Sequence, residues 1–248
     1  MVNIRQHDVS APILDAEAEE QFAKDWATYQ KIVDHDYAGH REVYGILHRI
    51  LGRDMAGPIR FLDLACGDAR GVVGALKGAR IAHYHGVDLS QPALDLAAQA
   101  LEALEALDCQ VELDRRDFVA AMADRPEPAD MVWIGLSLHH LESADKQVIM
   151  REALGVLGGR GAMVIYEPTR REDESREGYV ARFASTTKTL WSALDPDEWA
   201  AIADHVARCD LPETPSGWQL LARDAGFTRT EELFTASTDL YRMFRFRP

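Results

Sequence analysis

The sequence predicts an α/β fold, in which a doubly wound, mostly parallel sheet of seven strands carries helices on both faces. Short and almost continuously apolar segments alternate with helical segments between residues 59 and 168. That alternation is typical of parallel strands buried beneath helices. The last two segments, 228–234 and 239–246, instead alternate apolar and polar residues. They predict an antiparallel pair of strands that completes the sheet.

The N-terminal part of the chain is predicted to be helical. After an irregular start over residues 1–15, apolar side chains recur with helical spacing from residue 16 to residue 51. Gly39 is expected to divide this segment into two helices, and residues 52–58 end it.

The core that follows is predicted to alternate strands with helices. Strands are expected at 59–64, 81–87, 111–113, 130–136 and 162–166, and helices at 71–76, after Ser90, and at 144–157. Ser90 is a suitable helix cap, and Gly158 and Gly159 are expected to close the last of these helices.

A different segment separates this core from the terminal strands. Residues 169–178 are predicted to form a charged loop. Asp195, Pro196 and Glu198 then have the spacing of a capped helix start. A second helix is expected to begin at Ser216 and to end at Gly226.

Composition excludes several classes of protein. The 248 residues include 27 Lys and Arg against 41 Asp and Glu, which gives a net charge of −14. Nucleic acids and anionic membrane surfaces bind clustered basic residues, so neither is an expected partner. The three cysteines form no C-x-x-C motif, so we expect no disulfide framework and a cytoplasmic protein. We also expect no membrane span and no secretion signal.

The residues that follow the strands are the candidates for chemistry, because ligands of open parallel sheets bind beyond the carboxyl ends of the strands. The loop from Asp63 to Gly71 contains small residues that allow a ligand close to the backbone. It lacks the dinucleotide pattern G-x-G-x-x-G. The carboxylates of Asp63 and Asp68 would disfavour a pyrophosphate and suit an ammonium or sulfonium ligand.

The next two loops indicate a nucleoside. Asp88 ends the second predicted strand of the core, where a carboxylate can accept hydrogen bonds from ribose hydroxyls. Asp117 follows the third strand and can accept a hydrogen bond from an adenine amino group. Phe118 can stack on the base.

Five segments in this order resemble the class I, seven-stranded S-adenosylmethionine-dependent methyltransferases: FLDLACGDARG, GVDLS, RDF, DMVWIGLSLHHL and LGGRGAMVIYEP. The resemblance covers roughly residues 55–248 and implies S-adenosyl-L-methionine as cofactor. The family's first loop is usually D-x-G-x-G-x-G, whereas Ala65 and Ala69 occupy two glycine positions here.

The resemblance implies a division of the chain and a set of cofactor contacts. Residues 1–54 would form a helical lid, 55–168 the cofactor-binding core, 169–226 a helical insertion at the substrate pocket, and 227–248 the final strands. The predicted cofactor-binding residues are Asp63, Ala65, Cys66, Gly67, Arg70, Asp88, Leu89, Asp117, Phe118, Leu136 and Ser137.

Catalytic and substrate residues are less well marked in the sequence. His139 and His140 are candidate general bases, because histidine titrates near neutrality. The predicted substrate-binding residues are Tyr37, His40, Glu167 and Arg170, whereas Tyr44 is interpreted as core. No metal site is expected, since the histidines lack the H-x-x-x-H spacing.

The predicted reaction is SN2 transfer of a methyl group to an oxygen or nitrogen atom of a small molecule. Three alternatives remain: an NAD(P)-dependent oxidoreductase, a non-catalytic cofactor-binding partner subunit, and a protein or RNA methyltransferase. The sequence leaves open whether two copies form a homodimer.

Overall fold

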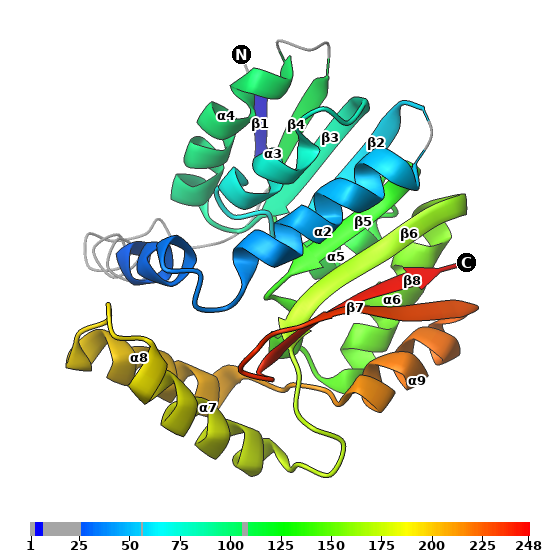
Figure 1. Ribbon diagram of the computed structural model, residues 1–248. Helices are drawn as coiled ribbons and strands as arrows, with labels where there is room; N and C mark the ends of the chain where they lie inside the picture. Colours follow the sequence, from blue (N-terminus) through cyan, green and yellow to red (C-terminus); the bar gives the residue numbers. More distant parts are fainter. Residues whose placement is uncertain (1–2, 7–25, 56, 106–108) are drawn as a thin grey trace.

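The computed structural model describes residues 3–6, 26–55, 57–105 and 109–248. Within these ranges eight strands form one sheet, in the order β1-β4-β3-β2-β5-β6-β8-β7 (Figure 1). The strands are β1 Asn3–Gln6, β2 Ile59–Leu64, β3 Ile81–Asp88, β4 Gln110–Arg115, β5 Ala129–Gly135, β6 Leu157–Pro168, β7 Arg229–Thr235 and β8 Tyr241–Arg247. Neighbours from β1 to β6 are parallel, and β8 pairs antiparallel with β6 and β7. The predicted α/β class and the antiparallel terminal pair are confirmed.

The sheet has one strand more than the seven predicted. β1 lies in the segment expected to be irregular and pairs in parallel with β4. Its sequence, NIRQ, contains a single apolar residue, so no period-two pattern marks it. Backbone hydrogen bonds to the edge of β4 keep this segment extended.

Helices cover both faces of the sheet. One layer contains α2 His40–Arg53, α3 Arg70–Leu76 and α4 Gln91–Glu105, and the other contains α5 Phe118–Ala123, α6 Ser143–Val156 and α9 Pro215–Ala225 (Figure 1). Alternate strand residues enter the two cores. Phe61 and Trp133 pack on the first layer, and Leu62 and Val132 pack on the second. Residues 26–34 are also helical, whereas the helix predicted from residue 16 to residue 25 lies outside the described residues.

Two predicted helix ends are confirmed. The side chain of Asp195 caps α8 Pro196–Cys209 and forms a capping box with Glu198. Gly226 ends α9 with φ 108°, in the left-handed region that glycine adopts without strain.

Two other predicted helix ends are wrong. Thr214, not Ser216, caps α9, because Pro215 takes the first helical position and the Thr214 hydroxyl accepts a hydrogen bond from the Gly217 N–H at 2.9 Å. α6 passes directly into β6 at Leu157, so Gly158 and Gly159 belong to the strand and do not close the helix.

The insertion contains a helix that its charged sequence conceals. α7 Arg176–Leu190 begins inside the predicted loop, with Ser175 as its cap. α7 and α8 lie beyond the carboxyl end of the sheet (Figure 1). This is the end of the sheet at which ligands of such folds bind, at the point where the strand order reverses between β2 and β5.

Candidate active site

A cavity of about 260 Å³ lies at the carboxyl ends of β2 and β5. Seven residues predicted to bind cofactor or substrate line it: His40, Asp63, Ala65, Cys66, Gly67, Leu136 and Ser137. The remaining lining includes Asp68, Gly71 and five aromatic side chains, which are Trp26, Tyr29, Tyr44, Trp133 and Tyr166. The cavity thus lies at the topological switch point, where ligands of this kind of sheet bind.

The loop after β2 has an unusual backbone. Ala65, Gly67 and Ala69 all adopt positive φ, at 55°, 54° and 56°. This conformation is strained for residues with a Cβ atom. These are the three positions where the methyltransferase pattern carries glycine, so two alanines here adopt a conformation that glycine adopts without strain.

Gly71 permits the close approach of α2 to this loop. A Cβ atom at Gly71 would overlap the ring of Tyr44. Because Tyr44 lines the cavity, the glycine fixes the distance between the N-terminal helices and the cofactor loop.

Asp63 places a buried carboxyl group at the cavity. It is 1% exposed, and it accepts a hydrogen bond from the Tyr84 hydroxyl at 2.6 Å. Burial and the nearby Asp88 carboxylate raise the pKa of Asp63 to about 8. A cationic group placed beside Asp63 would favour its ionised form.

Asp68 supplies a second carboxylate. It accepts a hydrogen bond from the Arg70 N–H at 3.1 Å and pairs with the Arg70 guanidinium at 3.2 Å. Burial nevertheless raises the pKa of Asp68 above its ordinary value. Arg70 itself is a neighbour of this carboxylate and not part of the cavity lining.

His40 lies among the aromatic residues of the cavity. Its ring centroid is 6.1 Å from that of Tyr29, 6.3 Å from Tyr44 and 6.0 Å from Tyr166. The side chain is 3% exposed, and neither ring nitrogen has a hydrogen-bond partner among the described residues. Burial lowers the pKa of His40 to about 4, so the imidazole is neutral at physiological pH.

The residues predicted to contact the adenosine moiety lie beyond this cavity. Asp88 accepts hydrogen bonds from the Gly67 and Ser90 N–H groups at 2.9 and 2.8 Å. Asp117 caps α5, where it accepts a hydrogen bond from the Ala120 N–H at 3.0 Å. Phe118 begins α5, and Leu89 is 53% exposed. Asp88 ends β3, the neighbour of β2, and contacts the loop after β2 through Gly67, whereas Asp117 and Phe118 follow β4, one strand further along the sheet.

Neither histidine predicted as a general base lines the cavity. His139 and His140 form a short 3-10 helix, η1 Leu138–His140. The His139 Nδ1 atom lies 2.7 Å from the Glu167 carboxylate. Glu167, predicted to bind substrate, is fully buried and accepts hydrogen bonds from the Ser137 and Leu138 N–H groups at 3.1 and 3.0 Å. It therefore holds the loop that carries Ser137 into the cavity wall.

Tyr37 and Arg170, two further predicted substrate residues, make contacts within the insertion. The Tyr37 hydroxyl accepts a hydrogen bond from the Ala193 N–H at 2.8 Å, and its ring stacks on Trp191 at 5.6 Å. Arg170 donates to the carbonyl oxygens of Pro212 and Glu174 at 3.1 and 2.7 Å. The structure thus brings Tyr44, which the sequence suggested was core, to the cavity and places Tyr37 elsewhere.

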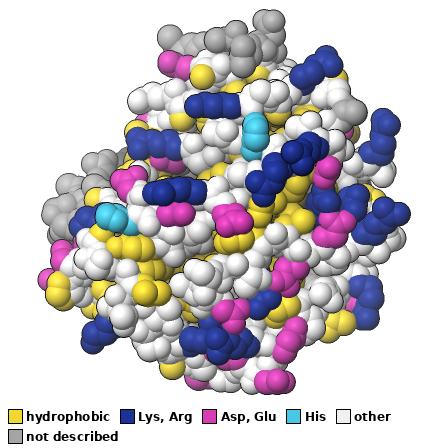
Figure 2. Space-filling model, in the orientation of Figure 1, with side chains coloured by type: hydrophobic (Ala, Val, Ile, Leu, Met, Phe, Trp, Pro, Cys, Tyr) yellow, Lys and Arg dark blue, Asp and Glu magenta, His cyan; other side chains and the backbone are white. Residues whose placement is uncertain are grey.

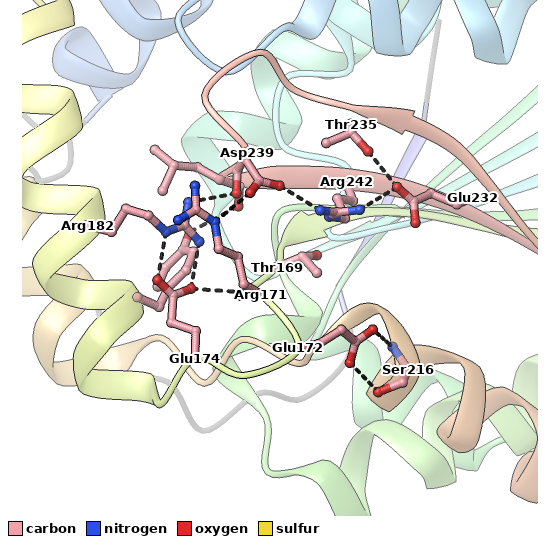
Figure 3. Close-up of polar contacts among 12 residues, drawn as sticks. Thr169, Arg171, Glu172, Glu174, Arg182, Ser216, Glu232, Thr235, Asp239 and Arg242 are labelled. Carbon is pink, nitrogen blue, oxygen red and sulfur yellow. Dashed lines mark hydrogen bonds and ion pairs between the residues drawn. The ribbon is translucent and has the colours of Figure 1, made fainter.

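The charged segment after β6 forms ordered ion pairs (Figure 3). Arg182 of α7 binds the Glu174 carboxylate at 2.7 Å, and Arg171 binds Asp239 at 2.8 Å. Asp239 also pairs with Arg242 of β8 at 2.6 Å. These contacts connect the insertion to the terminal strands, so the segment is not a freely solvated loop.

The strand order, the acidic residues at the strand ends and the cavity define a class I, Rossmann-like methyltransferase that depends on S-adenosylmethionine. Residues 61–161 match the family model of a methyltransferase domain. This match contains the cofactor loop, Asp88, Asp117 and the loop after β5.

Known proteins similar to this chain agree with that class. Carboxy-S-adenosyl-L-methionine synthase of Mannheimia succiniciproducens is 22% identical over 213 residues, which are 83% of this chain and 84% of that protein. An O-methyltransferase family protein from Burkholderia thailandensis has a TM-score of 0.65 at 18% identity, and the match covers 94% of this chain and 60% of the Burkholderia chain. Magnesium protoporphyrin IX methyltransferase from Synechocystis, solved with bound SAH, has a TM-score of 0.62 at 14% identity, and the match covers 95% of this chain and 98% of the Synechocystis chain.

Among the described helices, none combines the length and the apolar character required to cross a bilayer.

Proposed function

We propose that this methyltransferase transfers the methyl group of S-adenosylmethionine to an oxygen or nitrogen atom of a small molecule. The observation that carries the proposal is the cavity itself. Aromatic side chains from the N-terminal helices enclose the carboxyl ends of β2 and β5, and a buried, unpartnered imidazole lies among them. A concave site lined by aromatic side chains suits a small acceptor better than a macromolecular surface.

The residues present fit the cofactor. S-adenosylmethionine supplies an electrophilic methyl group on a sulfonium, and its methionine end carries an ammonium group. Asp63 and Asp68 offer carboxylates to these positive charges, and the aromatic rings offer π faces that attract cations. The positive-φ loop brings backbone close to the ligand, and Asp88 lies where ribose hydroxyls would donate hydrogen bonds.

The protein's contribution to the reaction is positioning. Methyl transfer requires the nucleophile, the methyl carbon and the sulfur to lie in line, and fixing such an alignment lowers the barrier substantially. Trp26, Tyr29 and Tyr44 exclude water from the cavity and restrict the acceptor. The neutral His40 accepts a hydrogen bond from the O–H or N–H group of the methyl acceptor. This hydrogen bond orients the lone pair of the acceptor atom towards the methyl group. His139 and His140 contribute indirectly, through the loop that contains Ser137.

The face shown in Figure 2 gives no support to a nucleic-acid substrate. On the face in Figure 2, Lys and Arg side chains are interspersed with Asp and Glu and form no continuous basic strip among the described residues. An NAD(P)-dependent oxidoreductase is disfavoured by the acidic loop after β2. The three free cysteines, of which Cys66 lines the cavity, are consistent with a reducing compartment, and we therefore propose a cytoplasmic location.

The test has two parts. Calorimetric titration with S-adenosylmethionine and its demethylated product should show binding, and binding of neither would overturn the proposal. Radiolabelled cofactor is then incubated with panels of phenols, amines and carboxylic acids, and separately with protein and RNA. Label in an extracted small molecule supports the proposal, whereas label confined to protein or RNA, or cofactor binding without transfer to any panel, contradicts it.

A further inference from the structure

A second cluster of polar side chains lies outside the cofactor cavity. The Asp210 Oδ1 atom, directly after α8, is surrounded by three imidazole nitrogens. His139 Nε2 is 3.7 Å away, His140 Nδ1 is 3.9 Å away, and His205 Nε2 of α8 is 3.9 Å away. η1 of the core and the insertion therefore contribute to one site.

The carboxylate at the centre of the cluster is buried, and its Oδ1 atom has no hydrogen-bond partner among the described residues. Asp210 is 3% exposed, and none of the described residues donates a hydrogen bond to its Oδ1 atom. A buried carboxylate oxygen without such a partner is costly. The three nitrogens are too distant for hydrogen bonds. Their distances to Asp210 Oδ1 exceed by about half an ångström the ~3.3 Å that separates two ligands of one tetrahedral zinc ion with bonds of about 2.0–2.1 Å. The ligand atoms of His139, His140 and Asp210 all lie within 4.8 Å of one another.

A second contact orients His139 for ligation. Its Nδ1 atom lies 2.7 Å from the Glu167 carboxylate, which also accepts hydrogen bonds from three backbone N–H groups of the same loop. A carboxylate that accepts hydrogen bonds on all sides requires the proton on His139 Nδ1, and this leaves Nε2, 3.7 Å from Asp210 Oδ1, with a free lone pair. Histidines that bind metals are commonly held by a carboxylate in this way.

We propose that His139 Nε2, His140 Nδ1 and Asp210 Oδ1 bind one divalent transition-metal ion of the zinc type, and that His205 Nε2, which lies 3.9 Å from Asp210 Oδ1 but outside this group of three, moves in as fourth ligand. A set of three imidazoles and one carboxylate suits Zn²⁺, Co²⁺ or Ni²⁺ and is too rich in nitrogen for Mg²⁺ or Ca²⁺. Sequence spacing conceals the site, because the ligands come from separate segments that only the tertiary fold brings together.

The ion would fasten the insertion to the core. His139 and His140 belong to the loop whose Ser137 lines the cofactor cavity. His205 lines a neighbouring cavity of about 480 Å³ together with Tyr29, and Tyr29 also belongs to the first cavity. Binding of the ion would therefore hold α8 against the loop after β5 and stabilise the wall between the two cavities.

The experiment uses the full chain treated with a chelator and then titrated with Zn²⁺ by calorimetry and with Co²⁺ by visible absorption. We expect one equivalent of each metal to bind, with Co²⁺ giving the intense d–d bands of a four-coordinate site. Zn²⁺ should also raise the melting temperature. Glu167→Gln removes a partner of one ligand and should weaken metal binding by about 10–100-fold. Asp210→Asn and His140→Gln remove ligands themselves and should weaken metal binding by more than this.

Two further variants keep the result interpretable. His205→Gln changes an exposed side chain, so it should fold normally and still weaken metal binding. His85→Gln is the matched control, because His85 lies in another histidine and carboxylate group with Glu112 and Asp114. Binding that survives in Asp210→Asn and His205→Gln, or that disappears in His85→Gln, would overturn the proposal, as would failure of the wild-type chain to bind one equivalent. None of these outcomes depends on cofactor binding, so the proposed function stands or falls separately.

Discussion

The Asp63→Asn variant should make the protein without cofactor more stable at alkaline pH and weaken its binding of S-adenosylmethionine. In the folded protein burial raises the pKa of Asp63 from 3.8 to about 8. The unfolded chain therefore releases this proton near pH 4, whereas the folded chain retains it to about pH 8. Between these values the unfolded state binds fewer protons, so the folded state loses stability as the pH rises.

The size of the effect follows from the two pKa values. Each pH unit between them is worth about 1.4 kcal/mol, so the wild type should lose up to about 4 kcal/mol between pH 5 and pH 8 from this residue alone. Asparagine cannot ionise, and the variant lacks this loss. Loss of a charged partner should weaken cofactor binding about 10–100-fold, because hydrogen bonds to charged groups contribute about 1.5–3 kcal/mol.

Urea denaturation at several pH values and calorimetry with cofactor measure the two effects. The wild type should also release protons on binding near pH 7, and the heat of binding should then vary with the ionisation enthalpy of the buffer. Asp63→Asn should abolish this variation. Equal pH dependence of stability in the two proteins, or unchanged cofactor affinity in the variant, would refute the assigned role of Asp63.

Three further predictions test the site and the fold. Gly71→Ala should destabilise the protein by about 1–3 kcal/mol and weaken cofactor binding, since its Cβ would displace an aromatic wall of the cavity. Gly74→Ala, on the same helix but with open space around it, should be neutral or stabilising in the same melts. Burial lowers the pKa of His40 to about 4, so the folded protein should lose up to about 3 kcal/mol of stability as the pH falls from 6.5 towards 4. His40→Gln should flatten this part of the pH profile of stability. An unchanged profile would contradict the burial of a neutral imidazole. Thr214→Ala should cost about 1 kcal/mol of unfolding free energy and Ser216→Ala less, with the reverse order refuting the observed cap.

The sequence predicts the strands well because parallel strands buried on both faces are almost continuously apolar. The bounds of β2 coincide with the predicted segment, and the residues that follow β2 and β5 line one cavity at the switch point, as the topology requires. The cap at Asp195 was predictable for a local reason, since a capping box involves only neighbours in sequence.

What sequence patterns cannot supply is the packing of distant segments. Tyr37 and Tyr44 have the same chemistry, and only the closeness of α2 to Gly71 decides which one lines the cavity. Asp210 lies far along the chain from His139, so no spacing rule joins them. β1 contains too little apolar sequence to show a pattern, and the existing sheet edge determines its conformation.

The most direct test of the central claim is a transfer assay with S-adenosylmethionine labelled on its methyl group, performed with the wild type and with Asp63→Asn against panels of small molecules, protein and RNA. We predict that the wild type labels at least one extractable phenol, amine or carboxylic acid, and that Asp63→Asn does so with a reduced kcat/KM. Label found only in macromolecules, or wild-type protein that neither binds S-adenosylmethionine nor transfers its methyl group, would contradict the account.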